Sequence, residues 1–454
     1  MIQIIRLEDD EELDLESMER SGVIAEDIME SARAIVADVK ARGDEALTEY
    51  TARFDQAAVA DFRVGDDALE AAVEQIEPAV AEALDAACES IASFHENDVP
   101  SSTFKMTDDG SMVGYKVSPI ASVGLYIPGG RASYPSTVLM NAVPAKIAGV
   151  ERIVMVTPPN PDGSIDPSLL YAAYIAGVDE VYCVGGAQAI AALAYGTKTI
   201  APVDKIVGPG NVFVAAAKEI VSGAVGTDLQ AGPSEVLILA DDTAEPALIA
   251  ADMIAQAEHD PRACCYLVCV GGEIIEDVVD ELEKQTAEAP RREIIEAALD
   301  ENGLIVECSS FDNALRTVNA IAPEHLEIQA DQPMELVGYI RNAGAIFVGP
   351  WSPVAIGDYI AGPSHTLPTS GTARFSSPLS TWDFIKRSSV ISYSYAALLR
   401  DYEAVTEIAE SEGFAAHAQS LRARIDLVEG ELAALAEVEF EDEDEEPEEE
   451  DGAE

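Results

Sequence analysis

The hydrophobic positions in the middle of the chain alternate between short β-branched runs and longer Ala-rich stretches. Apolar stretches with helical spacing follow each of the strand-like runs ASVGLYIP, ERIVMVTP and DEVYCVGG. Short strands separated by helices are typical of a parallel sheet with right-handed crossovers. The pattern therefore predicts a Rossmann-like domain at residues 119–235.

A second series of alternating strands and helices follows at residues 236–383. The expected strands are SEVLILAD, CCYLVCVG, GLIVEC, HLEIQA and AGAIFVG. Residues 1–118 have the apolar spacing of amphipathic helices, and we expect this region to pack on the second α/β domain. The predicted fold class is α/β, with two Rossmann-like domains, one inserted in the other, and small helical N- and C-terminal extensions.

The C-terminal part of the chain changes character twice. Residues 384–437 contain one strand-like run, SVISYS, followed by helical patterns, which is too little for an independent core. We expect this segment to be an arm that contributes to a partner subunit. Residues 438–454 are almost entirely acidic, and we expect a solvated, disordered tail there.

The overall composition is that of a large globular protein. Hydrophobic residues make up 48% of the 454 residues, which is enough for a sizeable core. No apolar run reaches the length of a membrane span, and the acidic start MIQIIRLEDDEELD does not resemble a secretory signal. The expected location is the cytoplasm, with no membrane partner.

The charge of the chain is extreme. Its 84 acidic and 27 basic residues give a formal net charge of −57 at pH 7. Self-repulsion of this size destabilises a compact state unless salt screens it, so we expect a halophilic protein that folds well at high ionic strength. The alternative, a disordered acidic chain, disagrees with the regular apolar periodicity outside the tail. Nucleic acid is not expected as a partner because a basic surface is missing.

The six cysteines do not form a metal-binding pattern. The sequence has no CxxC pair, and Cys264, Cys265 and Cys269 lie within the apolar run ACCYLVCV. This placement indicates buried strand thiols and not ligands or disulfides. Any metal ion should therefore be held by nitrogen and oxygen donors.

The chain has only five histidines, and four of them lie in tight polar motifs. These motifs are QAEHD, PEHLE, GPSHTLP and EGFAAH, which contain His259, His325, His365 and His417 respectively. The fifth, His95 in SFHEND, has no such company, and we expect it on the surface. The concentration of histidine in polar motifs suggests an enzyme that keeps metal ligands and a proton-transfer group.

The first motif places Gln256 and His259 on one face of a helix end. They are three residues apart in an Ala-rich segment that Asp260-Pro261 terminates. Zinc accepts imidazole nitrogen and amide oxygen, so this pair can hold it. On this motif alone, a histidine that complements the helix dipole is the favoured alternative.

The second motif joins a carboxylate and an imidazole, Glu324 and His325, in the turn before a strand. Adjacent residues on extended backbone point to opposite sides, so the two should serve different steps and not form one hydrogen-bonded pair. Imidazole can take an alcohol proton, and a carboxylate can activate water. A chance Glu-His pair in an exposed loop is the alternative.

Two further segments offer ionisable groups. Asp358 and His365 lie in a Gly/Pro-rich loop directly after the expected strand AGAIFVG, and α/β folds build sites at the carboxyl ends of parallel strands. Glu412 and His417 lie five residues apart in the arm, on roughly adjacent faces if a helix runs through Gly413. A surface helix with scattered charges is the alternative for the second pair.

Three Gly-rich turns, IPGGRASYPS, VGGAQAI and VGPGN, each follow an expected strand and precede an expected helix. Main-chain amides and a helix N-terminus at such a turn can bind phosphate. None of the turns is GxGxxG, so the residues alone indicate a site for a nucleotide or another anionic ligand.

The motifs together resemble those of histidinol dehydrogenases. The resemblance spans about residues 20–430, in the family's order, and rests on GLYIPGGRASYPS, GGAQAIAALAYGT, KIVGPGNVFVAAAK, AGPSEVLILAD, QAEHD, APEHLEI, GDYIAGPSHTLPT and EGFAAHAQSLRAR. It implies a zinc-dependent, NAD-linked four-electron oxidation of L-histidinol to L-histidine through L-histidinal, the last steps of histidine biosynthesis. It also implies a homodimer whose active site is shared between subunits.

The resemblance assigns roles to particular residues. The implied ligands of one Zn²⁺ per subunit are Gln256, His259, Asp358 and, from the other subunit, His417. The implied catalytic residues are Glu324, which activates water, and His325, which takes the alcohol proton. The implied NAD contacts are Tyr126, Gln188 and Asn211. Substrate contacts are implied for the ligands and the catalytic pair and for Ser234, His365 and Glu412.

Three other functions remain open from the sequence. The first is a related dehydrogenase for another small alcohol, which the presence of His365 and Glu412 argues against. The second is a zinc hydrolase that uses Glu324 with metal-bound water and needs no nicotinamide. The third is a non-catalytic binding protein, which would have no use for the pair Glu324 and His325.

Overall fold

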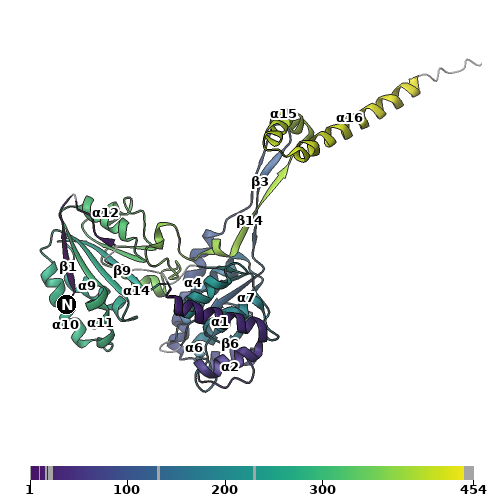
Figure 1. The fold of residues 1–454 in the computed structure, drawn as a ribbon. Coiled ribbons are helices and arrows are strands. Elements are labelled where there is room, and N and C mark those ends of the chain that lie inside the picture. Colours follow the sequence, from purple (N-terminus) through teal and green to yellow (C-terminus); the bar gives the residue numbers. More distant parts are fainter. Residues whose placement is uncertain are drawn as a thin grey trace, which may run out of the picture. The chain divides into compact units, whose positions relative to one another are not determined.

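The computed structural model of the chain describes residues 2–9, 11–15, 18, 24–129, 133–228 and 232–443; of residues 433–443 only the helical main chain is described. The chain forms two compact units (Figure 1). Unit 1 comprises Met1–Pro100 and Pro119–Lys386, and unit 2 comprises Ser101–Ser118 and Arg387–Glu454. Both units therefore combine segments that lie far apart in the sequence.

Unit 1 contains a five-stranded parallel sheet, which we call the first sheet. Its strands are β4 (Ser122–Tyr126), β5 (Arg152–Thr157), β6 (Glu180–Cys183), β7 (Lys205–Val207) and β8 (Gly226–Thr227). Its helices are α5 (Pro135–Ala148), α6 (Pro167–Ile175), α7 (Gly186–Tyr195) and α8 (Val212–Val221). The strand order is β6-β5-β4-β7-β8, so the order reverses between β4 and β7.

Local sequence explains where these helices begin and end. Pro135 starts α5, at a position where an N–H would have no partner within the helix. Gly149 ends α5 with a φ of 89°, which favours glycine, and its N–H bonds back to the carbonyls of the last turn. Asp166 caps α6 by accepting the N–H of Ser168 at 2.8 Å.

Unit 1 also contains a six-stranded parallel sheet, the second sheet. Its strands are β1 (Gln3–Leu7), β9 (Glu235–Asp241), β10 (Cys264–Val270), β11 (Gly303–Cys308), β12 (His325–Gln329) and β13 (Ala345–Val348), in the spatial order β1-β11-β10-β9-β12-β13. Its helices are α9 (Pro246–Ala257), α10 (Ile275–Glu288), α11 (Arg292–Asn302), α12 (Phe311–Ile321), α13 (Pro333–Val337) and α14 (Val354–Tyr359). The predicted α/β class with parallel strands is confirmed. Cys264, Cys265 and Cys269 are buried in β10, and none of the three forms a disulfide with a described residue.

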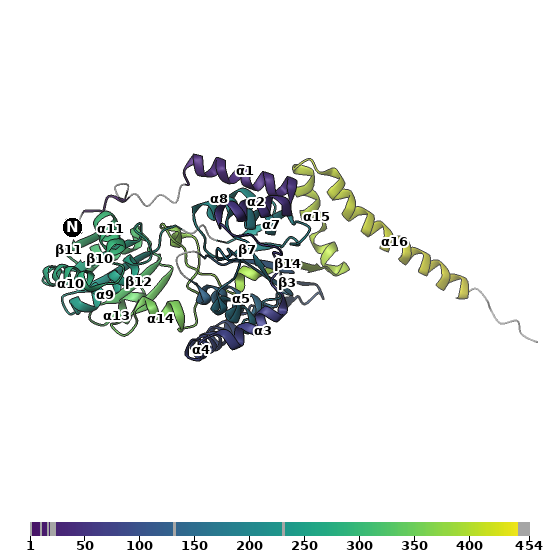
Figure 2. The same cartoon turned by 90° about the horizontal axis from the view of Figure 1, so that it is seen from below.

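The N-terminal helices pack on the first sheet and not on the second, where the sequence pattern placed them. They are α1 (Glu26–Arg42), α2 (Asp44–Phe54), α3 (Asp66–Gln75) and α4 (Pro78–His95). Figure 2 shows α1 beside α7 and α8, and α3 and α4 contact α6 and α5. Ile35 and Val39 of α1 join the hydrophobic cluster of the first sheet. An amphipathic pattern predicts a buried face but not the surface that covers it. The second sheet receives β1, which pairs with β11.

His95 is buried at the end of α4, with 1% of its surface exposed, so its expected surface location is wrong. The buried residues of α4 are Leu84, Ala87, Ile91 and His95. Their spacing of three and four residues is that of one helix face. The signal for burial was therefore present in the sequence.

Unit 2 combines the C-terminal arm with a hairpin from the N-terminal region. The hairpin strands β2 (Thr103–Met106) and β3 (Met112–Pro119) are antiparallel, and β14 (Ile385–Ser392) lies beside β3. α15 (Tyr395–Ser411) and α16 (Ala415–Glu443) follow. The hairpin lies within residues 1–118, which the apolar pattern assigned to helices, so that boundary is wrong at its end.

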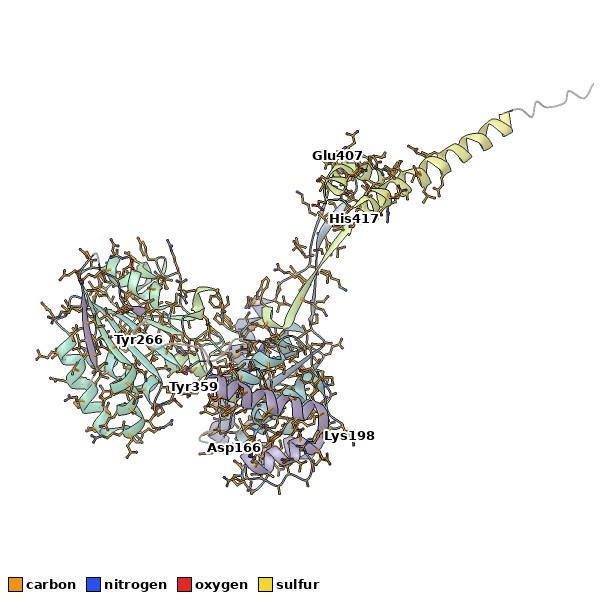
Figure 3. All side chains as sticks on the ribbon, in the orientation of Figure 1. Asp166, Lys198, Tyr266, Tyr359, Glu407 and His417 are labelled. Carbon is orange, nitrogen blue, oxygen red and sulfur yellow. The ribbon has the colours of Figure 1, made fainter. Side chains whose placement is uncertain are left out.

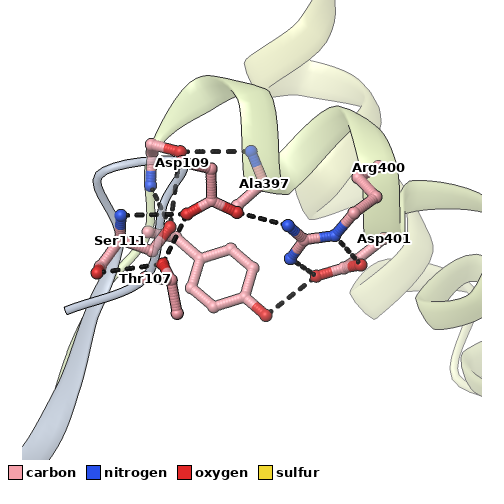
Figure 4. Close-up of polar contacts among 8 residues, drawn as sticks. Thr107, Asp109, Ser111, Ala397, Arg400 and Asp401 are labelled. Atoms are coloured by element: carbon pink, nitrogen blue, oxygen red, sulfur yellow. Dashed lines mark hydrogen bonds and ion pairs between the residues drawn. The ribbon is translucent and has the colours of Figure 1, made fainter. Parts of the chain in front are cut away.

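An acidic residue ties the hairpin turn to α15 (Figure 4). Asp109 accepts hydrogen bonds from the hydroxyl of Thr107 at 2.5 Å and from the N–H of Ser111 at 3.0 Å, and it pairs with Arg400. The hydrogen bonds from Thr107 and Ser111 and the pairing with Arg400 hold the pKa of Asp109 well below its usual range. Arg400 also pairs with Asp401 at 2.9 Å. The hairpin and the arm are thus joined by charged groups within unit 2.

The two arm helices are separate because Gly413 adopts a φ of 80° between them. Glu412 and His417 therefore do not share a helix, contrary to one option that the spacing allowed. α16 continues to Glu443, so the first residues of the expected disordered tail are helical. Residues 444–454 lie outside the described residues. In the described part of the chain, no helix is both long enough and apolar enough to cross a bilayer.

Candidate active site

Most candidate residues of unit 1 meet at the amino edge of the second sheet. Ser234 precedes β9, His325 is the first residue of β12, and Gln256 and His259 lie just before β10. Parallel strands start at the same edge, so these residues come to one place. The sequence pattern had favoured the carboxyl edge, where α/β folds usually build sites. For the second sheet that expectation is wrong.

Asp358 reaches the amino edge because α14 runs back along the sheet. β13 ends at Val348, at the carboxyl edge, and α14 then returns with Asp358 in its last turn. The Oδ1 atom of Asp358 lies 3.8 Å from Nε2 of His325. The loop after β13 thus delivers a carboxylate to the edge where β12 begins.

The main chain of Glu235 holds both Glu324 and His325. The Oε2 atom of Glu324 accepts the N–H of Glu235 at 2.7 Å, and Nδ1 of His325 lies 2.9 Å from the Glu235 carbonyl oxygen. A carbonyl can only accept, so Nδ1 carries the hydrogen, and Nε2 holds the lone pair of the neutral ring. Nδ1 and the Glu324 Oε2 atom are 3.5 Å apart. The two side chains form an electrostatic pair in which each is hydrogen-bonded to Glu235.

Burial changes the proton affinity of this pair. It raises the pKa of Glu324 to about 7, although the charge of His325 opposes the change. Burial alone lowers the pKa of His325, but the charges of Glu324 and Asp358 outweigh it and raise this pKa to about 9. Burial also disfavours the charged form of Asp358, but contact with His325 outweighs it and lowers the pKa of Asp358. Such perturbed groups are typical of sites that move protons.

His365 supports Asp358 through the main chain. Its Nδ1 atom lies 3.0 Å from the carbonyl oxygen of Asp358, and its Nε2 atom lies 3.3 Å from the hydroxyl of Thr137 on α5. Nδ1 therefore donates to the carbonyl, and Nε2 of the neutral ring accepts from Thr137. Burial lowers the pKa of His365, which favours this neutral form.

Gln256 and His259 complete the cluster. Gln256 is 3% exposed, and its amide nitrogen has no hydrogen-bond partner. The ring of His259 reaches solvent, but the protein around it limits its hydration and lowers its pKa, which the charge of Asp358 opposes. Amide, imidazole and carboxylate are donors that a divalent ion such as zinc accepts. Across the described ranges, no three His, Cys, Asp or Glu side chains converge to hold a metal ion by themselves.

The residues expected to contact NAD lie at the carboxyl edge of the first sheet. Tyr126 ends β4, Gln188 lies in the first turn of α7 after β6, and Asn211 caps α8 after β7. The Tyr126 hydroxyl accepts the N–H of Gly186 at 3.1 Å. Both polar atoms of the Gln188 side chain are buried without a partner. Tyr126 and Asn211 flank the reversal of strand order between β4 and β7, where open α/β sheets bind ligands.

A buried ion pair fixes the turn that leads to Asn211. Asp228 accepts the N–H of Gly208 at 2.6 Å, and Lys218 donates to the carbonyl of the same glycine. Lys218 and Asp228 are 2.5 Å apart. Gly208 has a φ of 107°, and an added Cβ would lie 2.2 Å from the main-chain oxygen of Tyr126. The Asn211 Oδ1 atom accepts the N–H groups of its own helix, which leaves its amide hydrogens for a ligand.

Glu412 and His417 lie in unit 2 and line a cavity of about 670 Å³ there. Glu412 ends α15, and His417 lies in the first turn of α16, where Figure 3 labels it. Both side chains are exposed. The cavity also contains the exposed apolar side chains Ile408 and Phe414.

Sequence reasoning missed two groups of this site. Glu235 acts through its main chain, and a main-chain contact leaves no signal in residue type. Thr137 lies on a helix of the first sheet, and nothing in its sequence surroundings connects it with His365.

Comparison with known proteins identifies the family. A family model described as histidinol dehydrogenase matches residues 18–425. The chain belongs to the histidinol dehydrogenase family. It is 48% identical over 406 residues to a histidinol dehydrogenase of Bacillus anthracis, covering 89% of this chain and 94% of that one. It is 51% identical over 396 residues to that of a Synechococcus species, covering 87% and 91%.

Solved structures agree with this assignment. The crystal structure of histidinol dehydrogenase from Elizabethkingia anophelis is 34% identical and superposes with a TM-score of 0.88, covering 94% of this chain and 99% of that one. Family membership makes the chain an oxidoreductase of histidine biosynthesis.

Proposed function

We propose that the chain oxidises L-histidinol to L-histidine through L-histidinal, with two NAD molecules reduced in turn and one zinc ion per subunit. The observation that carries the proposal is the arrangement of Glu324 and His325 on the main chain of Glu235. It leaves two buried groups with different proton affinities side by side, in a chain of the histidinol dehydrogenase family. Two successive oxidations require two different proton-transfer tasks.

In the first oxidation, Nε2 of His325 takes the hydroxyl proton of histidinol as hydride leaves the same carbon. The hydrogen bond from Nδ1 to Glu235 keeps the ring in the tautomer that this step needs. In the second oxidation, Glu324 takes a proton from the water that adds to the aldehyde. Its pKa of about 7 leaves a substantial fraction of the carboxylate ionised at neutral pH.

The proposed metal ligands are Gln256, His259, Asp358 and the partner subunit's His417. When bound, zinc would orient the substrate, and NAD would supply the hydride acceptor. The unpaired amide of Gln256 and the mutual influence of His259 and Asp358 support this ligand set. Unit 1 supplies three of these donors, and only His259 and Asp358 are of the imidazole or carboxylate kind that usually binds zinc. This set is consistent with a fourth donor from the partner subunit. A cation on Asp358 would also offset the charge that keeps His325 protonated near neutral pH.

The remaining proposed site residues contact the substrate or NAD. Ser234, His365 and Glu412 are the further proposed substrate contacts, and Tyr126, Gln188 and Asn211 are the proposed NAD contacts. The unpaired amide of Gln188, two residues after Gly186, whose N–H binds the Tyr126 hydroxyl, supports the second set. Exposed Ile408 (60%) and Phe414 (52%) around Glu412 and His417 support a partner subunit that covers this surface.

The test is to follow NADH absorbance on adding limiting histidinol to the protein in concentrated KCl with zinc. We expect two NADH per histidinol, abolished by a chelator and restored by zinc. Turnover that needs no nicotinamide, or no NADH from protein shown to be folded, would overturn the proposal.

The shared site has a separate test. A His259→Ala protein and a His417→Ala protein should each be nearly inactive. In mixed dimers, one of the two sites would have both residues intact, so random re-pairing should restore about a quarter of the wild-type activity. No recovery, despite proven subunit exchange, would place both residues in one subunit.

A further inference from the structure

The elements β12, α9 and α14 carry residues of the candidate active site at the amino edge of the second sheet. They also contact one another deeper in this sheet. Their meeting point is Glu327 on β12, which is 1% exposed. Glu327 is part of the PEHLE motif, but the proposed function gives it no role. Any role must therefore come from what it touches.

Glu327 binds one group from each neighbouring element. Its Oε1 atom accepts the N–H of Val354, the first residue of α14, at 3.0 Å. Its carboxyl group is hydrogen-bonded to that of Asp252 on α9. The side-chain amide of Gln329 donates to both carboxyl groups, at 3.0 Å each. The node formed by Glu327, Asp252, Val354 and Gln329 thus joins β12, α9 and α14.

The node repeats the candidate site one layer below it. Glu327 lies two residues after His325 on the same face of β12, and Asp252 lies four residues before Gln256 on α9. Val354 lies four residues before Asp358 on α14. Two strand residues rise about 6.6 Å, and four helix residues rise about 6 Å. Each site residue therefore has a node residue beneath it at nearly the same depth.

The node is not held together by an ion pair, because its charged groups are two carboxyl groups and it contains no cation. Burial and the charge of Asp252 raise the pKa of Glu327 to about 8, so Glu327 keeps its proton at neutral pH and donates it to Asp252. Both oxygen atoms of Glu327 have partners, although Oε1 of Gln329 in the same node has none among the described residues. A buried carboxyl group bonded on both oxygens favours one arrangement of the elements around it. A group of this kind is well suited to fixing geometry.

We propose that Glu327 is a positioning residue of the metal site, which locks α9 and α14 against β12 and thereby sets where Gln256 and Asp358 present their oxygen atoms. This inference rests on the proposed zinc site. Outer groups that orient ligands typically change metal affinity about 10- to 100-fold when they are removed. The same size of effect is expected here.

The test compares Glu327→Gln with Glu327→Met in the full-length protein in concentrated KCl. Zinc affinity is measured by competition with a chromophoric chelator, and the visible absorption of the Co²⁺-loaded protein reports ligand geometry. Glutamine can accept from Val354 and donate to Asp252, so affinity and spectrum should stay close to wild type. Methionine removes the bonds to Val354, Asp252 and Gln329, so affinity should fall about 10- to 100-fold and the Co²⁺ bands should shift.

Two further variants make the result decisive. Val306→Ala on β11 lies in the same sheet away from the node, and it should lower stability without changing metal affinity. Val354→Pro removes the N–H that Glu327 accepts and keeps an apolar side chain in the core, at a first helical position that tolerates proline. It should weaken zinc binding less than methionine does, and it decides the matter if Glu327→Met does not fold.

Unchanged zinc affinity and spectrum in folded Glu327→Met, or in Val354→Pro if the former does not fold, would overturn the inference alone. Equal losses in the glutamine and methionine variants would also overturn it. Failure of the wild-type protein to bind either ion would overturn both the proposed metal site and this inference.

Discussion

Glu324 and His325 are neighbours in the sequence, yet the main chain of Glu235 prepares them differently. The N–H of Glu235 binds the carboxylate of Glu324, and its carbonyl binds the ring of His325. A residue on another strand thus sets the tautomer of His325 and stabilises the ionised form of Glu324 against the effect of burial. The residue types at 324 and 325 were readable from the sequence, but this division of their environment was not.

The two residues should separate the two oxidations. Glu324→Gln removes the group that takes a proton from water, so the stoichiometry should fall from two NADH per histidinol toward one, with aldehyde released. His325→Gln should slow the first oxidation by about 10²–10⁴-fold while ligand binding stays near normal. Single-turnover NADH absorbance and aldehyde trapping measure both effects.

His95→Gln is the control for these variants, because it alters a buried histidine outside the site and should keep the stoichiometry of two. Two NADH per histidinol from Glu324→Gln at normal rates would remove Glu324 from the second step.

The raised pKa of Glu327 should also make the free energy of unfolding depend on pH. Its pKa is about 8 in the folded protein against an ordinary value of 4.5. The folded state therefore holds an extra proton between these values, and this contribution, complete below about pH 4, is lost as the pH rises through 8. Glu327→Gln cannot lose that proton, so its free energy of unfolding should fall less steeply between pH 5 and 8, by up to ~1.4 kcal/mol per pH unit. Urea unfolding at constant KCl measures this; parallel curves for the two proteins would contradict it.

At the scale of helices and strands, the sequence predicted what local periodicity controls. The expected strands of both sheets are present, because each is a short apolar run between helices. The hairpin of β2 and β3 was missed because its exposed residues alternate too weakly to stand out from the helices before it. The prediction that α1 to α4 pack on the second sheet was wrong, because an amphipathic pattern does not indicate which surface covers the apolar face.

The location of the site shows the same limit. Motifs of the right residue types were recognisable, but α14 turns back after β13 and brings Asp358 to the amino edge. The direction of a short helix after a Pro-containing loop depends on tertiary contacts, here the bond between Val354 and Glu327. Strand patterns alone therefore predicted the wrong edge.

The buried pair of Lys218 and Asp228 belongs to this scale, because it holds the turn between β7 and α8. Lys218→Met leaves the Asp228 carboxylate buried without its partner, which should lower the free energy of unfolding by about 3–5 kcal/mol. The loosened turn carries Asn211, so the KM for NAD should rise more than the KM for histidinol. Denaturant unfolding and steady-state kinetics measure the two effects.

The double variant with Asp228→Asn should recover part of the lost stability, because no unpaired charge remains. Equal changes in the two KM values would separate the ion pair from the NAD contacts.

For the whole molecule, charge is the dominant feature. A net charge of −57 is carried by one chain whose ion pairs lie mostly at the surface, such as those of Arg42 and Arg400. Exposed pairs contribute little to stability. The folded state therefore depends on screening of repulsion among the remaining acids.

The protein should gain stability steeply with salt. Tm should rise between 0.2 and 2 M KCl (~7 Å to under 3 Å screening length), with most of the gain in the lower half of the range. Thermal unfolding followed by circular dichroism checks this. A variant truncated after residue 443 should show the same rise in Tm if repulsion among the acidic residues of the remaining chain is the cause. A Tm independent of KCl would contradict the halophilic character expected from the composition.

The pairing of β1 with β11 has a consequence during synthesis. Gln3–Leu7 leaves the ribosome about 300 residues ahead of its partner Leu304–Cys308. At typical elongation rates of about 5–20 residues per second, β1 waits on the order of 15–60 s for its place. Until then, the apolar N-terminal strand is open to wrong partners. The chaperones that meet this chain during translation should therefore bind β1 while β11 is still to be made.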